Sequence, residues 1–90
     1  MIDKSLWSAE ELAIFEFYDY KCLNCDKPGD VLHELVPKSK APKTWMRPSN
    51  RVVLCNICHD NAHKIGASVS RQILIAKREK KYESWASFYV

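Results

Sequence analysis

The sequence lacks the long apolar runs and the leader that would place it in or across a membrane. No apolar stretch approaches the roughly 18 residues that a membrane-spanning helix requires. The N-terminal stretch MIDKSLWSAEEL contains no basic region followed by an apolar core. There is also no internal repeat and no low-complexity linker. We therefore expect one cytoplasmic domain over residues 1–90, without a membrane partner.

A chain of 90 residues is short for a domain that depends on a hydrophobic core alone. At this length folding buries only about 60–65% of the surface that the unfolded chain exposes, so such domains usually need a cross-link. Cys22 and Cys25 form one C-x2-C pair, and Cys55 and Cys58 form a second. Two such pairs without a secretory leader are typical of a tetrahedral zinc site. A redox dithiol would need only one pair, so we predict a structural zinc bound by all four cysteines, in a reducing compartment.

Charge is distributed unevenly along the chain. Residues 1–37 hold three Lys or Arg and eight Asp or Glu, whereas residues 38–81 hold eleven Lys or Arg and two acids. The second segment therefore carries a net charge of +9, against +3 for the whole chain. A basic segment of this kind is typical of proteins that bind a polyanion, usually nucleic acid. The alternative is that the lysines only solvate the surface.

The pattern of apolar residues and helix signals predicts an α+β domain. Ser8 and Glu11 form the S-x-x-E capping box that begins a first helix. Gly66 ends a short helix, and Ser68 or Ser70 caps the last one. The aromatic tail, residues 83–90, is expected to pack on the body. The expected elements are a helix of about ten residues after the capping box, strands at 30–36 and 51–55, and helices at 56–65 and 71–82.

The three histidines occupy positions from which they can meet at one metal. His33 lies in the first expected strand, beside Glu34. His59 and His63 are four residues apart on an expected helix, so they share one face and can bind the same ion. Cys58 and His59 are adjacent, and adjacent helix positions diverge by about 100°. The cysteines and the histidines can therefore serve two different metals.

One known family shows the same combination of residues. The chain resembles the HNH nucleases of the ββα-metal fold, in their zinc-ribbon-containing branch, over residues 22–63, with the pattern C-x2-C … H-E-L-V-P … N-x4-C-x2-C-H-x3-H. The resemblance implies a small ββα-metal (His-Me finger) core stapled by the four-cysteine zinc, with flanking N- and C-terminal helices. In that family the first strand carries a metal ligand followed directly by the general base. The second strand carries an asparagine that orients the base or the loop, and the helix supplies the remaining ligands.

By position, the resemblance assigns roles to five residues. His33, His59 and His63 are the ligands of a catalytic divalent metal, Glu34 is the general base, and Asn50 is the orienting asparagine. The predicted catalytic residues are thus Glu34, His33, Asn50 and His59. The usual base of the family is a histidine; a glutamate carboxylate is a weaker base, but it is ionised at neutral pH and accepts a proton from water. Three nitrogen ligands favour Zn²⁺, Ni²⁺ or Mn²⁺ over Mg²⁺.

Two alternatives stay open for the His33-Glu34 pair. In a shifted register Asp30 is the ligand and His33 is the base, although the spacing to the following proline then fails. In a degenerate site Glu34 is only a surface residue and the metal is lost. Neighbours in a regular strand point to opposite faces, so both side chains flank one phosphate only where the strand twists, bulges or ends. Asn50 could equally serve as a turn residue.

The predicted partner is DNA, contacted mainly through its phosphate backbone. Nothing in the chain reads like a base-recognition helix, so we expect low sequence specificity. Arg71, Arg78 and Lys81 fall near one face of the last expected helix. The basic loop between the strands supplies the main predicted contacts, which are Lys38, Lys40, Lys43, Arg47 and Arg51.

The sequence therefore predicts a metal-dependent DNA endonuclease or nickase that hydrolyses phosphodiester bonds. Its minimal size is typical of phage or mobile-element proteins, which adds phage packaging proteins and other proteins to the expected partners. One rival is a non-catalytic, zinc-stabilised DNA-binding module with a degenerate HNH site. A second rival is a zinc domain whose basic surface binds an acidic protein.

Overall fold

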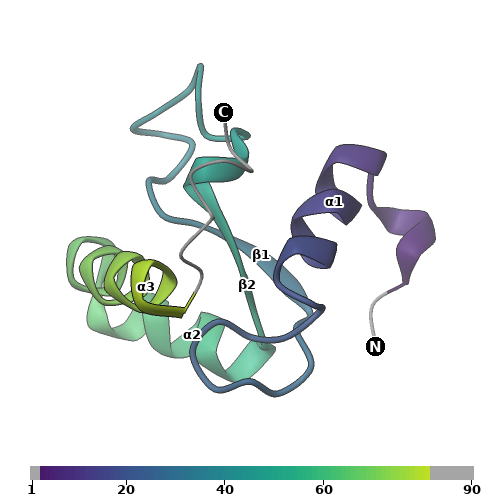
Figure 1. Ribbon diagram of the computed structural model, residues 1–90. Helices are drawn as coiled ribbons and strands as arrows, with labels where there is room; N and C mark the ends of the chain where they lie inside the picture. The colour runs from purple at the N-terminus through teal and green to yellow at the C-terminus, as the bar shows by residue number, and fades with distance from the viewer. Residues whose placement is uncertain (1–2, 82–90) are drawn as a thin grey trace.

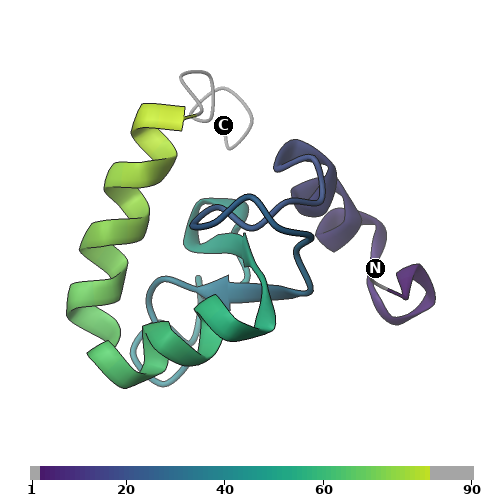
Figure 2. The same ribbon diagram turned by 90° about the horizontal axis from the view of Figure 1, so that it is seen from below.

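A two-stranded sheet lies between helices in the computed structural model, which describes residues 3–81 (Figure 1). The strands pair antiparallel, with His33 opposite Val52 and Glu34 opposite Arg51. Helix α1 packs against β2, while α2 packs against both strands and α3 packs on α2 (Figure 2). The described part of the chain is thus a small mixed α/β structure. The elements in chain order are η1 (Lys4–Leu6), α1 (Ala9–Phe17), β1 (Val31–Glu34), η2 (Pro48–Asn50), β2 (Arg51–Leu54), α2 (Asn56–Ile65) and α3 (Ala67–Lys81).

The hairpin forms the centre of the core because it is covered on both faces. Paired residues of antiparallel strands share a face, and the His33 ring contacts α2 while Arg51 contacts α1. All four residues of β2 are buried, as expected for a strand with a helix on either side. The apolar core gathers residues from almost every element, namely Ile14, Phe15, Tyr18, Leu23, Leu32, Leu35, Val52, Val53, Leu54, Ala62 and Leu74.

One carboxylate both begins α1 and attaches it to the hairpin. The predicted capping box is confirmed: Glu11 N donates to Ser8 Oγ at 3.2 Å, and Ser8 N donates to Glu11 Oε1 at 3.1 Å. The second oxygen of Glu11 pairs with the Arg51 guanidinium on β2 at 3.0 Å. The Arg51 side chain is only 8% exposed. Glu11 therefore provides a local helix signal and a tertiary contact at once.

A left-handed turn at Asp19 and Tyr20 leads the chain from α1 into a knuckle, residues 21–29, that rests on β2. Asp19 N donates to Glu16 O and Tyr20 N to Phe15 O, at 2.9 and 2.8 Å, which is the hydrogen-bond pattern of a Schellman motif. Gly29 closes the knuckle where it touches the sheet. A Cβ at Gly29 would lie 2.1 Å from Val53 Cγ1, so only glycine fits this close approach.

Two predicted boundaries are wrong, and each has a physical reason. The strand predicted at 30–36 ends at Glu34, because the backbone of Val36 binds the Asn50 side chain instead of a strand partner. The helix predicted from residue 71 begins at Ala67, directly after Gly66. Ser70 lies inside that helix, where its hydroxyl donates to Ala67 O at 3.2 Å. The predicted tail, residues 83–90, lies outside the described residues.

The helix at 56–65 is confirmed with both of its ends. Helix α2 spans Asn56–Ile65, and Gly66 follows it with φ of 97°, a conformation that favours glycine. This helix is therefore set by local signals, with a cysteine at its start and a glycine at its end.

Glu11→Gln should lower the free energy of unfolding by about 1–3 kcal/mol, because it leaves the buried Arg51 guanidinium without a charged partner. Glutamine keeps an oxygen for the capping box, so the loss reports mainly on the ion pair. The control is Glu10→Gln, which removes the same charge from the same helix turn at an exposed position. Urea unfolding of both variants measures the difference. Equal losses in the two variants would contradict the assigned role of Glu11.

Candidate metal centres

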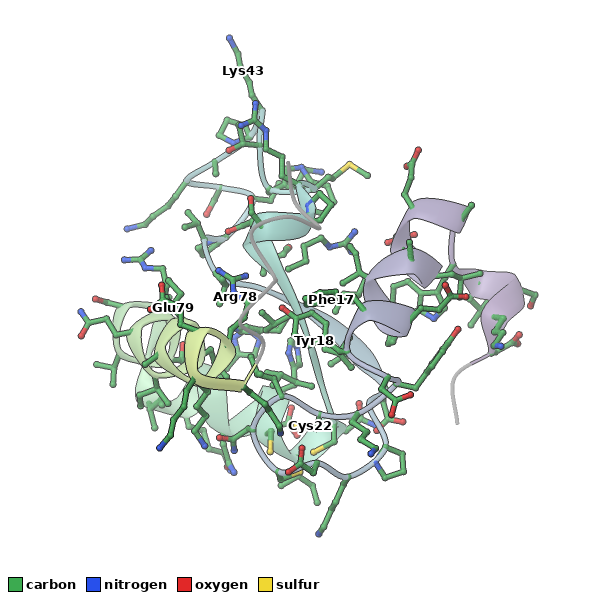
Figure 3. All side chains as sticks on the ribbon, in the orientation of Figure 1. Phe17, Tyr18, Cys22, Lys43, Arg78 and Glu79 are labelled. Atoms are coloured by element: carbon green, nitrogen blue, oxygen red, sulfur yellow. The ribbon has the colours of Figure 1, made fainter. Side chains whose placement is uncertain are left out.

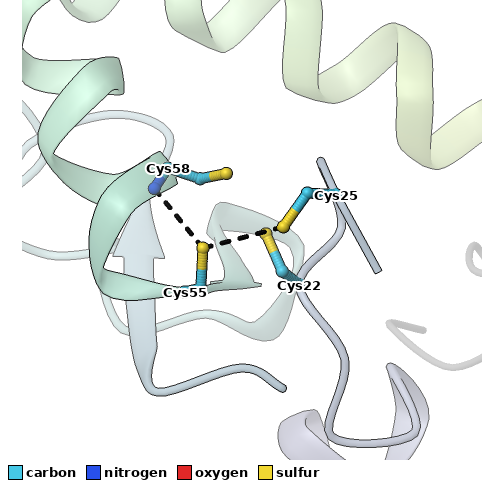
Figure 4. A group of neighbouring side chains, drawn as sticks. All are labelled: Cys22, Cys25, Cys55 and Cys58. Carbon is cyan, nitrogen blue, oxygen red and sulfur yellow. Dashed lines mark hydrogen bonds between the residues drawn. The ribbon is translucent and has the colours of Figure 1, made fainter. Parts of the chain in front are cut away.

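Four thiols converge between the knuckle and the start of α2 (Figure 4). Cys22 and Cys25 come from the knuckle, Cys55 is the N-cap of α2, and Cys58 lies in its first turn. All four sulfurs lie within 4.8 Å of one another, and the Sγ atoms of Cys25 and Cys55 are 3.7 Å apart. Sulfurs at about 2.3 Å from a tetrahedral zinc are about 3.8 Å from each other. The four cysteines are therefore positioned to hold a metal ion and are compatible with a structural zinc.

Backbone hydrogen bonds fix the knuckle half of this cluster. Cys22 N donates to Lys27 O at 2.7 Å, and Asp26 N donates to Cys22 O at 2.9 Å. Leu23 N donates to Val53 O of β2 at 2.9 Å, which holds the knuckle on the sheet. The same strand leads directly into Cys55. Both halves of the cluster are thus attached to β2.

Asn24 adds a contact to the cluster that the sequence analysis missed. Its Nδ2 donates to Cys58 Sγ at 3.2 Å, and its oxygens accept from Lys77 Nζ on α3. The only signal in the sequence is the position of Asn24 between the two cysteines of the first pair. Donors of this kind stabilise a metal-bound thiolate. Asn24 therefore joins the cysteine cluster to α3.

Burial keeps part of the cluster protonated when no cation is present. It raises the pKa of the Cys58 thiol to about 12 and also raises the pKa of Cys22. At Cys55 burial acts in the same direction, but hydrogen bonds led by the one from Cys58 N outweigh it and lower the pKa. Metal binding must therefore displace protons from the cluster.

Three imidazoles form a second cluster on the other side of α2. His33 comes from β1, and His59 and His63 come from α2. The Nδ1 atoms of His33 and His59 are 3.2 Å apart, and so are the Nε2 atoms of His59 and His63. The two contacts use different nitrogens of His59, and one ring gives one nitrogen to one cation. A set with one nitrogen from each ring lies within 4.8 Å, so the three rings could hold a metal ion.

The environment of His33 and His59 favours the neutral imidazole, which is the form that binds metals. Burial, followed by the charges on His59 and His63, lowers the pKa of His33 to about 4. Burial and His63 also lower the pKa of His59, while the carboxylates of Asp60 and Glu34 oppose this shift. At neutral pH His33 therefore offers a lone pair rather than a charge.

A cavity of about 330 Å³ opens beside the histidines. Glu34 lines it together with His33, His59 and His63. The alternation of side chains along a strand would separate His33 from Glu34, but β1 ends at Glu34. Asp30 is not among the described residues that line this cavity, and its carboxylate accepts from Asn56 N at 3.4 Å. The cavity thus brings Glu34 together with the three histidines.

Asn50 holds the loop between the strands and does not line the cavity of the histidines. Its Oδ1 accepts from Val36 N at 2.8 Å, and its Nδ2 donates to Val36 O and to Trp45 O, both at 3.0 Å. Asn50 thus connects the segment after β1 to the middle of the loop. Of the two roles expected for it, the geometry matches bracing of the loop.

Most of the basic loop is exposed, but one of its predicted DNA contacts is not. Lys38, Lys40, Lys43 and Arg47 are exposed, and Lys43 points away from the body of the molecule (Figure 3). Arg51 is buried and paired with the α1 carboxylate. Because its guanidinium is buried in an ion pair with Glu11, the prediction of Arg51 as a DNA contact is not retained.

Helix α3 also uses charges that were expected to face DNA. Arg78 is buried, and its Nη1 donates to Ser49 O at 2.9 Å. Lys81 pairs with Asp26 of the knuckle. These contacts attach α3 to η2 at one point and to the knuckle at another. Of the expected basic face of α3, Arg78 is therefore buried in the protein and Lys81 is paired with a carboxylate.

Removal of metal from the cysteine cluster should abolish the cooperative thermal unfolding transition, because structural zinc supplies free energy that a small domain needs. A strong chelator under reducing conditions strips the metal, and near-UV circular dichroism follows tertiary structure. Addition of Zn²⁺ should restore the transition, whereas Mg²⁺, which prefers oxygen ligands, should not. An unchanged transition in the stripped protein would refute the structural role of the cluster.

The described residues include no helix that combines enough length and apolar character to cross a bilayer. Comparison of the chain with models of protein families, with curated proteins and with solved structures finds no match. The function is therefore inferred from the two clusters, the cavity and the basic surface of this chain.

Proposed function

We propose that this protein is a metal-dependent DNA endonuclease or nickase of the HNH type. One observation carries the proposal: three imidazoles from β1 and α2 converge on a cavity that an acidic residue, Glu34, also lines. The order of the elements, two strands followed by a helix, agrees with a ββα-metal core. The cysteine cluster would then bind the structural zinc, which would attach the helix to the hairpin.

The two clusters differ in the coordination that they leave open. Four thiolates complete a tetrahedral site, whereas three imidazoles leave a position for water or substrate. His33, His59 and His63 would hold a divalent cation, which would supply Lewis-acid stabilisation of the charge that develops on the leaving oxygen. Imidazole ligands favour Zn²⁺, Ni²⁺ or Mn²⁺ for this position.

Glu34 is the proposed general base. A water oxygen attacks the phosphorus, the proton of that water passes to the Glu34 carboxylate, and the bond to the leaving oxygen breaks. A carboxylate is ionised at neutral pH and is therefore ready to accept the proton. Asn50 acts as a positioning residue, because it binds both backbone groups of Val36, two residues after Glu34.

The exposed cations of the loop provide the surface for DNA. Lys38, Lys40, Lys43 and Arg47 follow the end of β1 within a short segment, so they lie on the part of the chain that leaves the cavity. Contacts of this kind with phosphates are independent of base sequence and weaken steeply as salt increases. The proposal therefore includes low sequence specificity.

The protein should convert supercoiled plasmid to nicked circles with Mn²⁺ or Ni²⁺, and Glu34→Gln should reduce the rate by about 10²–10⁴-fold. The matched control is Glu79→Gln, an exposed glutamate on α3, which should cleave like the wild type. Agarose gels measure the nicked fraction, and metal analysis should show that Glu34→Gln keeps its metal.

Full activity of Glu34→Gln would show that another residue is the general base. Intact plasmid at high protein concentration, together with salt-sensitive retention of the DNA, would favour the non-catalytic DNA-binding module. Absence of any retention would favour a protein partner.

Metal analysis of the purified protein should give two ions per chain, and His59→Ala should reduce the number to one. His59 lies between the other two imidazoles, so its loss removes the central ligand of the second site. With Co²⁺ as the probe, the sulfur-to-metal charge-transfer absorption should be unchanged in His59→Ala, because the four thiolates remain. Asp60→Ala, an exposed neighbour on α2, is the control and should keep both ions. A wild-type protein with a single thiolate-bound ion would contradict the proposed catalytic metal.

A further inference from the structure

A second cavity, of about 320 Å³, lies between the basic loop and α3. Three of the four arginines in the chain line it: Arg47 from the loop, and Arg71 and Arg78 from α3. No Asp or Glu among the described residues lines this cavity. We name it the arginine cavity. Its lining gathers positive charge from segments that are more than twenty residues apart in sequence.

The three guanidinium groups lie at graded depths. Arg78 is buried and points from α3 toward the middle of the molecule (Figure 3), where its Nη1 donates to Ser49 O at 2.9 Å. Arg71, two turns earlier on α3, is half-buried, and Arg47 is exposed at the loop. Thr44 and Ser49 add polar groups to the lining. The cavity thus has a fixed cationic floor and a rim from which two further guanidinium groups can close on a ligand.

This composition matches a phosphate group. The planar fork of arginine forms paired hydrogen bonds with phosphate oxygens, which the point charge of lysine does not reproduce. A partly desolvated site strengthens such charged hydrogen bonds. The lysines at 38, 40 and 43 lie on the exposed loop and provide only a diffuse positive surface. The arginine cavity provides a defined position for one phosphate.

The arginine cavity adjoins the cavity of the histidines along two segments. Glu34 lines the cavity of the histidines, and the next residue, Leu35, lines the arginine cavity. On α3, Ser70 lines the cavity of the histidines and Arg71 lines the arginine cavity. We propose that the arginine cavity binds a backbone phosphate of DNA that neighbours the cleaved phosphodiester. The identity of the ligand as DNA rests on the proposed function.

The test measures binding of a short DNA duplex over a range of salt concentrations, in the Glu34→Gln background so that the duplex stays intact. Arg71→Gln should weaken binding about tenfold and reduce the slope of log affinity against log salt by about 1. Arg71→Lys keeps the charge, so it should keep the slope and lose less affinity. Lys27→Gln removes one exposed charge from the knuckle and is the control. Circular dichroism verifies that each variant is folded.

Arg71→Gln with the affinity and slope of Lys27→Gln would overturn the assignment. A second arm titrates ¹⁵N-labelled protein with inorganic phosphate and follows the arginine side-chain resonances. The duplex should shift the side-chain resonances of Arg47 and Arg71 at far lower concentration than inorganic phosphate does. Equal shifts at equal concentrations would assign the cavity to a free phosphate instead. A reduced slope in Arg71→Gln, combined with no plasmid cleavage by the wild type, would support the cavity and reject the endonuclease.

Discussion

The attachment of α2 to the end of β2 determines the positions of Cys55, Cys58, His59 and His63. Cys55 directly follows β2 and caps α2, so its backbone direction sets the rotation of the helix. Successive residues on a helix diverge by about 100°, which sends Cys58 to the knuckle and His59 to β1. A change in this rotation would move both clusters at once. The cysteine cluster therefore has a consequence beyond stability, because the same helix rotation that places Cys58 also places the histidines.

Charge in this small protein serves packing as well as solvation. Arg51 joins β2 to α1, Arg78 joins α3 to η2, and Lys77 and Lys81 join α3 to the knuckle. A core of this size buries little apolar surface, so such contacts contribute a larger share of the stability. Four of the exposed cations, Lys38, Lys40, Lys43 and Arg47, lie on the loop between the strands. Packing thus separates the cations of this chain into an internal set and a surface set.

Local signals predicted the parts of the fold that local interactions determine. The capping box at Ser8, the helix that ends at Gly66 and the pairing of the two C-x2-C motifs follow from residue spacing alone. The convergence of His33 with the α2 histidines was expected from the resemblance, and the distances agree with it. The length of β1, the start of α3 and the burial of Arg51 depend on partners distant in sequence. No spacing rule identifies those partners. The sequence therefore predicted that the cations of residues 38–81 are exposed, whereas Arg51 and Arg78 are buried.

Anomalous X-ray scattering at the zinc edge, from crystals of the zinc-loaded protein, tests the central claim most directly. We expect two separate peaks in the anomalous map. One lies among the four sulfurs and the other among the rings of His33, His59 and His63. A single peak among the sulfurs, or one ion shared between Cys58 and His59, would contradict a helix that presents two metal sites on two of its sides.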